Sequence, residues 1–172
     1  WFFYLNEGAG RETMWQDAKT VAEDHVSQWP YQWMKHPEYP TQRAQVQGKI
    51  NIKDGSNPKG ARVILAQPEG GDIPDWQQQG KDYIFWTKAD SDGSFTIDDV
   101  RSGTYTLYAI VEGVMDEFRL DSVIVKEGNT TELGQLDWEP VKYGKTEWQI
   151  GIPDRNSTEF FRGDDFRHWG LW

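Results

Sequence analysis

The feature that most constrains this sequence is a change in the spacing of its apolar residues near residue 43. From there to residue 138, apolar and polar side chains alternate in seven short runs, separated by turn residues such as Asp54-Gly55 and Asp92-Gly93. A period of two puts one face of a strand against a core and the other towards solvent. The pattern predicts a mainly β fold, a seven-stranded antiparallel β-sandwich. The residues that carry the alternation are Val46, Gly48, Ile50, Ile52, Ala61, Val63, Leu65, Tyr83, Phe85, Thr87, Phe95, Ile97, Tyr105, Leu107, Ala109, Val111, Val123, Val125, Leu133 and Leu136.

Before residue 43 the period is different, and residues 12–29 predict one amphipathic helix. Thr13 and Gln16 have the spacing of a capping box at its start. Pro30 ends it, because proline cannot donate the helical hydrogen bond. Residues 31–40, with two prolines and three large aromatic residues, predict an irregular segment. Apolar residues recur every three or four positions and so share one helical face: Met14, Trp15, Ala18, Val21, Ala22, Val26 and Trp29.

Both ends of the sequence are strongly aromatic, which indicates a piece of a larger protein. Residues 1–5 predict a strand followed at once by a turn, and residues 166–172 stop within an apolar stretch. Natural chain ends are seldom so aromatic. The alternative is that the two ends pair with each other in one closed domain.

Composition excludes several functional classes. The 172 residues contain no cysteine, which excludes disulfides, zinc–thiolate sites and a cysteine nucleophile. The net charge is −10, and residues 41–140 hold 10 basic and 17 acidic residues, so this region repels polyanions and no nucleic-acid partner is expected. No apolar run approaches the roughly 20 residues that cross a bilayer, so no membrane partner is expected.

No motif in the sequence predicts a catalytic residue or a metal ligand. The run Asp90-Ser91-Asp92-Gly93-Ser94 resembles part of a calcium loop, but Lys88 and Asp99 stand where an EF-hand needs its first ligand and its closing glutamate. We therefore interpret the run as a turn and expect no cofactor in this chain. A calcium site is left open only for a longer parent protein. The carboxylate pairs 98–99 and 164–165 are adjacent in sequence, so on a strand they would point to opposite faces and could not act together as acid and base.

The side chains best suited to bind a ligand lie near the C-terminal end. Planar rings stack on the apolar faces of sugars, and arginine binds uronate carboxylates through two hydrogen bonds. The candidate carbohydrate-binding residues are therefore Arg162, Arg167, Trp169 and Trp172. The competing interpretation is that the tryptophans belong to the core of a domain cut short, and that the arginines pair with neighbouring aspartates.

Four stretches of the sequence resemble a known family. Residues 80–109, with Asp92-Gly93-Ser94-Phe95 and Val100-Arg101-Ser102-Gly103, resemble the second domain of polysaccharide lyase family 4, the rhamnogalacturonan lyases. Residues 1–8 resemble the closing strand of that family's catalytic domain, and residues 27–33 its connecting helix. Residues 148–155 resemble the opening of its third domain.

The resemblance implies four parts in this chain. Residues 1–9 would close an upstream domain, and 10–42 would form a connecting helix and irregular segment. Residues 43–138 would form a fibronectin-III or prealbumin-like β-sandwich, and 139–172 the start of a jelly-roll domain like those of carbohydrate-binding modules.

The resemblance also implies a function for the parent protein. The parent would be a secreted, periplasmic or cell-surface enzyme that cleaves the pectic polysaccharide rhamnogalacturonan I by β-elimination. The lysine and histidine thought to be catalytic in the family lie in its first domain, upstream of residue 1. This chain would then be a non-catalytic part whose partners are the catalytic domain and the jelly roll. Two alternatives stay open: a free-standing carbohydrate-binding module, and a regulatory or adhesion sandwich unrelated to sugars.

Overall fold

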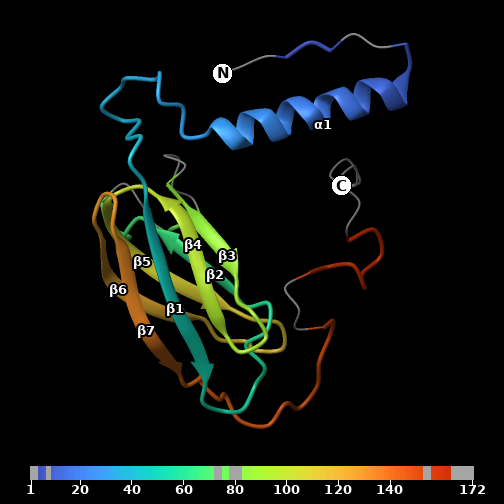
Figure 1. The fold of residues 1–172 in the computed structure, drawn as a ribbon. Coiled ribbons are helices and arrows are strands. Elements are labelled where there is room, and N and C mark those ends of the chain that lie inside the picture. Colours follow the sequence, from blue (N-terminus) through green and yellow to red (C-terminus); the bar gives the residue numbers. More distant parts are fainter. Residues whose placement is uncertain (1–3, 7–8, 72–74, 78–82, 153–155, 164–172) are drawn as a thin grey trace. The chain divides into compact units, whose positions relative to one another are not determined.

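The computed structural model describes residues 4–6, 9–71, 75–77, 83–152 and 156–163 (Figure 1). The chain divides into two compact units, residues 1–42 and residues 43–172. Each unit is described by itself below.

The second unit contains a β-sandwich built from seven strands (Figure 1). One sheet has the order β4-β1-β7, and the other has the order β3-β2-β5-β6. The prediction of a mainly β sandwich with a single preceding helix is confirmed. The strands are β1 (Ala44–Ile52), β2 (Arg62–Ala66), β3 (Phe85–Lys88), β4 (Ser94–Val100), β5 (Gly103–Ile110), β6 (Phe118–Val125) and β7 (Thr130–Trp138).

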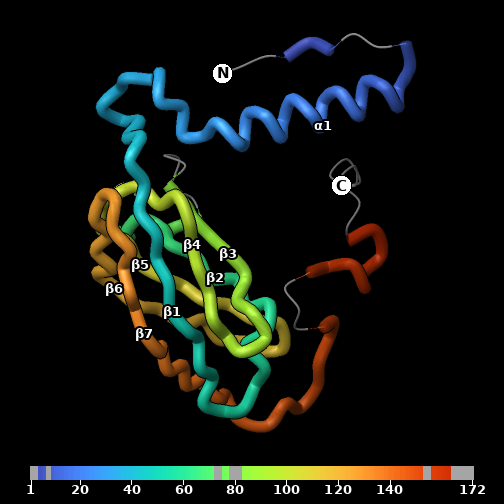
Figure 2. The backbone as a smooth tube through the Cα atoms, in the orientation of Figure 1, coloured from blue at the N-terminus to red at the C-terminus, as the bar shows by residue number. Residues whose placement is uncertain are grey.

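One strand pairing differs from the antiparallel arrangement that the sequence predicted. The first and last strands, β1 and β7, pair in parallel, with Gln45 opposite Thr130 and Ile52 opposite Trp138. The other four pairings are antiparallel. Figure 2 traces the chain along β1 and β7 in the same direction. The chain therefore enters the sandwich at one end, at the start of β1, and leaves it at the other, after β7.

The core lies between the inner faces of the two sheets. Tyr105 is 3% exposed, and its ring packs edge-on against Phe85 with the ring centroids 5.8 Å apart. Its hydroxyl donates a 2.7 Å hydrogen bond to the carbonyl oxygen of Arg101. This bond fixes the turn before β5 to the core, as the tyrosine corner does in immunoglobulin-type sandwiches. The core residues with the least exposed surface include Val46, Ile50, Val63, Leu65, Val100, Leu107 and Ala109.

Bulges in β6 and β7 change which residues face the core. In β7, Gly134 has a φ of +66° and lies where the register with β1 shifts, so the inward positions change from Leu133 to Leu136 and Trp138. In β6, Ser122 has a φ of +61° at a similar shift, between Leu120 and Val123. An extra residue moves the following side chains to the opposite face. The three-residue spacing of Leu133 and Leu136 has this cause.

The run that resembles a calcium loop is the turn that connects β3 of one sheet to β4 of the other. The Asp92 carboxylate accepts hydrogen bonds from the backbone N–H of Ser94 at 3.1 Å and from its hydroxyl at 2.9 Å, and pairs with Lys49 at 3.2 Å. Together these bonds hold the pKa of Asp92 down, to about 2. Gly93 has a φ of +86°, and its carbonyl accepts the Ile50 N–H at 2.9 Å.

The described part of the first unit contains one helix, α1 (Arg11–Gln28). None of its residues is buried. The capping box predicted at Thr13 and Gln16 is wrong, because the N-cap is Gly10 and no side chain caps it. The helix ends where Trp29 adopts an extended backbone before Pro30, since proline disfavours the helical conformation in the preceding residue. Trp15 on the predicted apolar face is 58% exposed.

The described segment after β7 contains no helix or strand. Its first residues are tied to the sandwich through Asp116, whose carboxylate accepts the Val141 N–H at 2.8 Å and the Trp138 indole N–H at 3.4 Å. Residues 157–163 form two consecutive turns, closed by the N–H groups of Phe160 and Gly163.

Candidate functional site on the outer face of the four-stranded sheet

The outer face of the sheet β3-β2-β5-β6 brings side chains from four strands into rows. In one row Trp86, Ile64, Tyr108 and Arg119 lie opposite one another across successive strands. In the next row Lys88, Arg62 and Ile110 do the same. Because side chains alternate between faces along a strand, these residues share the side away from the core.

The middle of this face carries a second, smaller apolar cluster. Ile64, Ala66 and Tyr108 are buried there, although no second sheet covers them. The cover comes from the long connection between β2 and β3, because Trp76 of that connection stacks on Tyr108 with ring centroids 5.5 Å apart. Tyr108 is only 1% exposed as a result.

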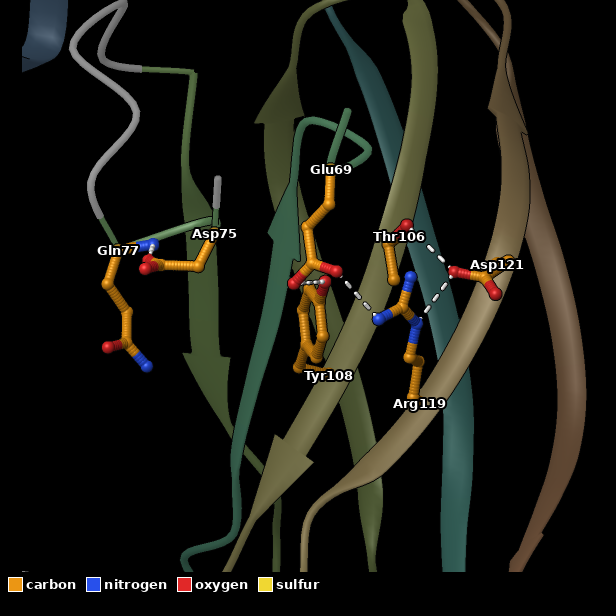
Figure 3. A network of polar contacts seen from close by, with 7 residues as sticks. All are labelled: Glu69, Asp75, Gln77, Thr106, Tyr108, Arg119 and Asp121. Atoms are coloured by element: carbon orange, nitrogen blue, oxygen red, sulfur yellow. Dashed lines mark hydrogen bonds and ion pairs between the residues drawn. The ribbon is translucent and has the colours of Figure 1, made fainter. Parts of the chain in front are cut away.

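A polar network surrounds Tyr108 and fixes the start of the same connection (Figure 3). Glu69 accepts a 3.1 Å hydrogen bond from the Tyr108 hydroxyl and pairs with Arg119 at 2.9 Å. Arg119 also donates through Nε to Asp121 at 2.9 Å, and Asp121 accepts the Thr106 hydroxyl at 3.1 Å. The network therefore joins the connection, β5 and β6.

Three groups of this network, Asp121, Arg119 and Tyr108, have pKa values that are shifted away from neutral pH. Hydrogen bonds from Arg119 and then Thr106 lower the pKa of Asp121, and the bonds to Asp121 and Glu69 raise the pKa of Arg119. Burial, followed by the bond to Glu69, raises the pKa of Tyr108 to about 12. A general acid or base works best with a pKa near the working pH. These groups are thus suited to holding the connection in place rather than to moving protons.

The end of the face next to this network is basic and open. Lys59, Arg62 and Lys88 line a hollow of about 250 Å³ together with Ile110 and Glu112. Trp86, two residues before Lys88 on the edge strand, is 60% exposed. Among the described residues, none of the three cationic side chains has an ion-pair partner.

The candidate site predicted from the sequence is only partly described. Arg162 is exposed and has a φ of +56°, at the end of the turns that follow residue 157. Arg167, Trp169 and Trp172 lie outside the described residues. The sugar-binding role of these four residues stays a prediction.

Neither histidine of the described chain belongs to a catalytic or metal-binding group. The Nδ1 atom of His25 lies 2.7 Å from the Tyr31 hydroxyl, and that of His36 accepts the Glu38 N–H at 3.1 Å. Within the described ranges, no three histidine, aspartate or glutamate side chains gather closely enough to hold a metal ion.

Sequence reasoning missed the outer-face cluster and its basic end. Arg62, Trp86 and Lys88 occupy the outward positions of their strands, where polar and exposed residues are ordinary. Only the register of β2 against β3 places Arg62 opposite Lys88 and Ile64 opposite Trp86. The signal that could have drawn attention to them was the tryptophan at an outward position between Phe85 and Thr87.

Comparison with known proteins assigns this sandwich to a family. Residues 58–133 match the family model described as polysaccharide lyase family 4, domain II. The sandwich matches the second domain of this family, and the resemblance seen in the sequence is confirmed.

The curated relatives carry the name rhamnogalacturonate lyase. This chain is 33% identical to the rhamnogalacturonate lyase of Dickeya dadantii (strain 3937) over 171 residues, covering 98% of this chain and 28% of that protein. It is 31% identical to the probable rhamnogalacturonate lyase B of Aspergillus niger over 172 residues, covering 94% of this chain and 24% of that protein. The chain therefore spans about a quarter of the length of the relatives it matches.

Comparison with solved structures matches the chain to a type II cohesin–X-dockerin complex from Acetivibrio cellulolyticus. The TM-score is 0.37 at 22% identity, covering 54% of this chain and 52% of that chain. At this score the likeness carries no functional argument.

Proposed function

We propose that this chain is a non-catalytic part of a longer lyase that cleaves rhamnogalacturonan by β-elimination. The observation that carries the proposal is the match of the sandwich to domain II, together with relatives named rhamnogalacturonate lyase along nearly the whole chain. β-Elimination needs a base beside the uronate carboxylate and a group that stabilises the developing negative charge. We infer that the catalytic centre lies outside this chain, in the part of the relatives' length that it does not span.

The task of the sandwich in that enzyme is to separate and position its neighbours. Its parallel first and last strands, each nine residues long, put the incoming and outgoing chain at opposite ends. A nine-residue strand spans about 30 Å, so the domain acts as a spacer of that length. In this arrangement residues 1–9 close the upstream domain, 10–42 connect it to the sandwich at 43–138, and 139–172 open a jelly roll.

Helix α1 supports the presence of such neighbours. Its 18 residues bury no side chain, and Trp15 and Val26 are exposed. Helices of this length gain most of their stability in proteins from packing an apolar face. We propose that this face packs on another part of the longer protein.

The substrate also suggests where the enzyme works. Pectic polysaccharide lies outside cells, so the proposed activity requires secretion, export to the periplasm or display at the cell surface. No helix among the described residues is long and apolar enough to span a membrane.

The test is a β-elimination assay, which follows the absorbance of the unsaturated product released from rhamnogalacturonan. The longer protein that contains this sequence should produce the signal, and the 172-residue chain alone should produce none. Turnover by the chain alone would contradict its non-catalytic role. A longer protein without action on rhamnogalacturonan would contradict the proposed enzyme.

A second proposed role, sugar binding near the C-terminal end, rests on the composition of that segment. Arg162, Arg167, Trp169 and Trp172 supply rings for stacking and guanidinium groups for carboxylates. If this role is correct, Trp169→Ala weakens the binding of rhamnogalacturonan oligosaccharides measured by calorimetry.

A further inference from the structure

The basic end of the sheet β3-β2-β5-β6 is unlike the rest of this acidic sandwich. Three other basic side chains of the sandwich pair with carboxylates: Lys49 with Asp92, Lys53 with Asp137, and Arg119 with Glu69 and Asp121. At the basic end, Lys59, Arg62 and Lys88 line one hollow without such a partner among the described residues. Acidic residues outnumber basic ones by 17 to 10 between residues 41 and 140, so carboxylates are plentiful in this region.

The strand register brings two of these cations together. Arg62 and Lys88 lie directly opposite each other in the antiparallel pair β2–β3, and both are exposed on the outer face. Like charges directly opposite each other destabilise a sheet. A bound anion would remove this repulsion, and Glu112 is the one carboxylate among the residues that line the hollow.

We propose that this basic end is a binding site for a uronate sugar of a pectic main chain. The carboxylate of the sugar binds Arg62 and Lys88, with Lys59 close by, and a neighbouring sugar ring stacks on Trp86. This proposal rests on the proposed function for the choice of a pectic ligand.

The geometry of β3 suits a saccharide that carries both an apolar face and a charge. Trp86 and Lys88 are two residues apart on the same face, which separates them by about 7 Å along the strand. Trp86 is 60% exposed at the edge of the sheet, so its ring is open to a ligand. The guanidinium of Arg62 can hold a carboxylate through two parallel hydrogen bonds.

The charge around the site favours a saccharide over a nucleic acid. The net charge of −7 over residues 41–140 repels a ligand that carries a negative charge at every unit. A main chain in which uronates alternate with neutral sugars presents one carboxylate to the basic end and an uncharged ring to Trp86. The site therefore distinguishes ligands by charge spacing as well as by sign.

The test is calorimetry of this chain with rhamnogalacturonan oligosaccharides at low ionic strength. The unmodified chain should bind them saturably, and the same oligosaccharides with their carboxylates reduced to alcohols should not bind. Arg62→Gln should weaken binding about tenfold or more, since it removes the charge-assisted hydrogen bonds. The matched control is Lys126→Gln, which removes one charge from an exposed lysine outside the basic hollow and should change the affinity less than about twofold.

Trp86→Ala provides an independent measurement. It should weaken binding about tenfold and remove the change in tryptophan fluorescence that accompanies binding to the unmodified chain. Both substitutions are at exposed positions, so both variants should fold. Urea unfolding of each variant verifies this.

Several results would overturn the proposal. Absence of saturable binding, equal binding of inorganic phosphate, or unchanged affinity in Arg62→Gln and Trp86→Ala would each do so. Loss of binding in Trp169→Ala but not in Trp86→Ala would assign the ligand to the C-terminal segment. If the chain fails to bind while the longer protein still cleaves rhamnogalacturonan, this site is refuted and the proposed function stands.

Discussion

Gly93 is the residue at which the turn between β3 and β4 meets the body of the sandwich. A Cβ atom there would lie 2.2 Å from the carbonyl oxygen of Ile50, and the φ of +86° is one that only glycine adopts freely. Asp92 next to it bonds forward to Ser94 and across to Lys49. The two residues resemble a metal loop in sequence, yet the Asp92 side chain and the Gly93 backbone hold the turn that carries the chain from one sheet to the other.

The first prediction concerns Gly93→Ala, which should lower the free energy of unfolding. The loss should exceed the cost of a left-handed backbone for alanine, because the added Cβ also clashes with the Ile50 carbonyl. The control is Gly113→Ala, because Gly113 has a φ of +82° but no atom within 4 Å of an added Cβ. The left-handed conformation costs a non-glycine residue about 1–2 kcal/mol, which is the loss expected for the control. Urea unfolding measures both, and equal losses would contradict the clash at Ile50.

The residues of the candidate site show where sequence reasoning stops at this scale. Arg62, Trp86 and Lys88 are unremarkable singly, because outward positions of strands commonly carry polar or exposed side chains. Tyr108 falls on the polar side of the alternation in β5, yet it is buried beneath Trp76. The grouping of the basic residues and the burial of Tyr108 both depend on a segment that is distant in the sequence. A local sequence pattern does not contain that information.

At the scale of elements, alternation predicted the seven strands and their core faces well. It failed at the two bulges, where Ser122 and Gly134 interrupt the period, and at the pairing of β1 with β7. Strand pairing over so long a separation is decided by tertiary packing, so no short-range signal reports its direction. The helix was predicted correctly, but Gly10 rather than a side chain begins it.

The second prediction is that the sandwich is stable without the first unit. Helix α1 buries no side chain, and the core cluster of the sandwich draws only on residues from Ala44 onwards. Removing residues 1–42 should therefore change the free energy of unfolding of the sandwich by less than about 0.5 kcal/mol, the size of a typical surface effect. Urea unfolding followed by tryptophan fluorescence compares the two chains, and a loss of several kcal/mol would contradict this independence.

At the scale of the whole molecule, charge is distributed unevenly. The region 41–140 has a net charge of −7, whereas residues 141–172 contain five basic and five acidic residues. The sandwich region is acidic, although its basic end carries Lys59, Arg62 and Lys88. Titratable groups at its surface and core then set the pH range over which it stays folded.

The third prediction concerns that range. The pKa values of Asp92 and Asp137 are lowered to about 2, chiefly by bonds from Ser94 and from Lys53. Unfolding restores their ordinary values near 3.8, so the unfolded chain binds protons more readily and stability falls as the pH drops below about 4 towards 2. Urea midpoints measured across this range should show the fall, and Asp137→Asn should reduce it.

The same reasoning applies in reverse at high pH. Burial raises the pKa values of Tyr105 and Tyr108 from 10 to about 12. The unfolded chain then loses these protons first, so stability falls as the pH rises from about 10 to 12. Tyr105→Phe should make the slope of the urea midpoint against pH shallower in this window, and an unchanged slope would contradict the assignment.

The parallel pairing of β1 and β7 has a mechanical consequence. Tension between the start of β1 and the end of β7 runs along both strands, so it shears their ladder and loads its hydrogen bonds together. An antiparallel terminal pair pulled from its open end would unzip one bond at a time. The sandwich can therefore transmit a pull between its two chain ends without opening.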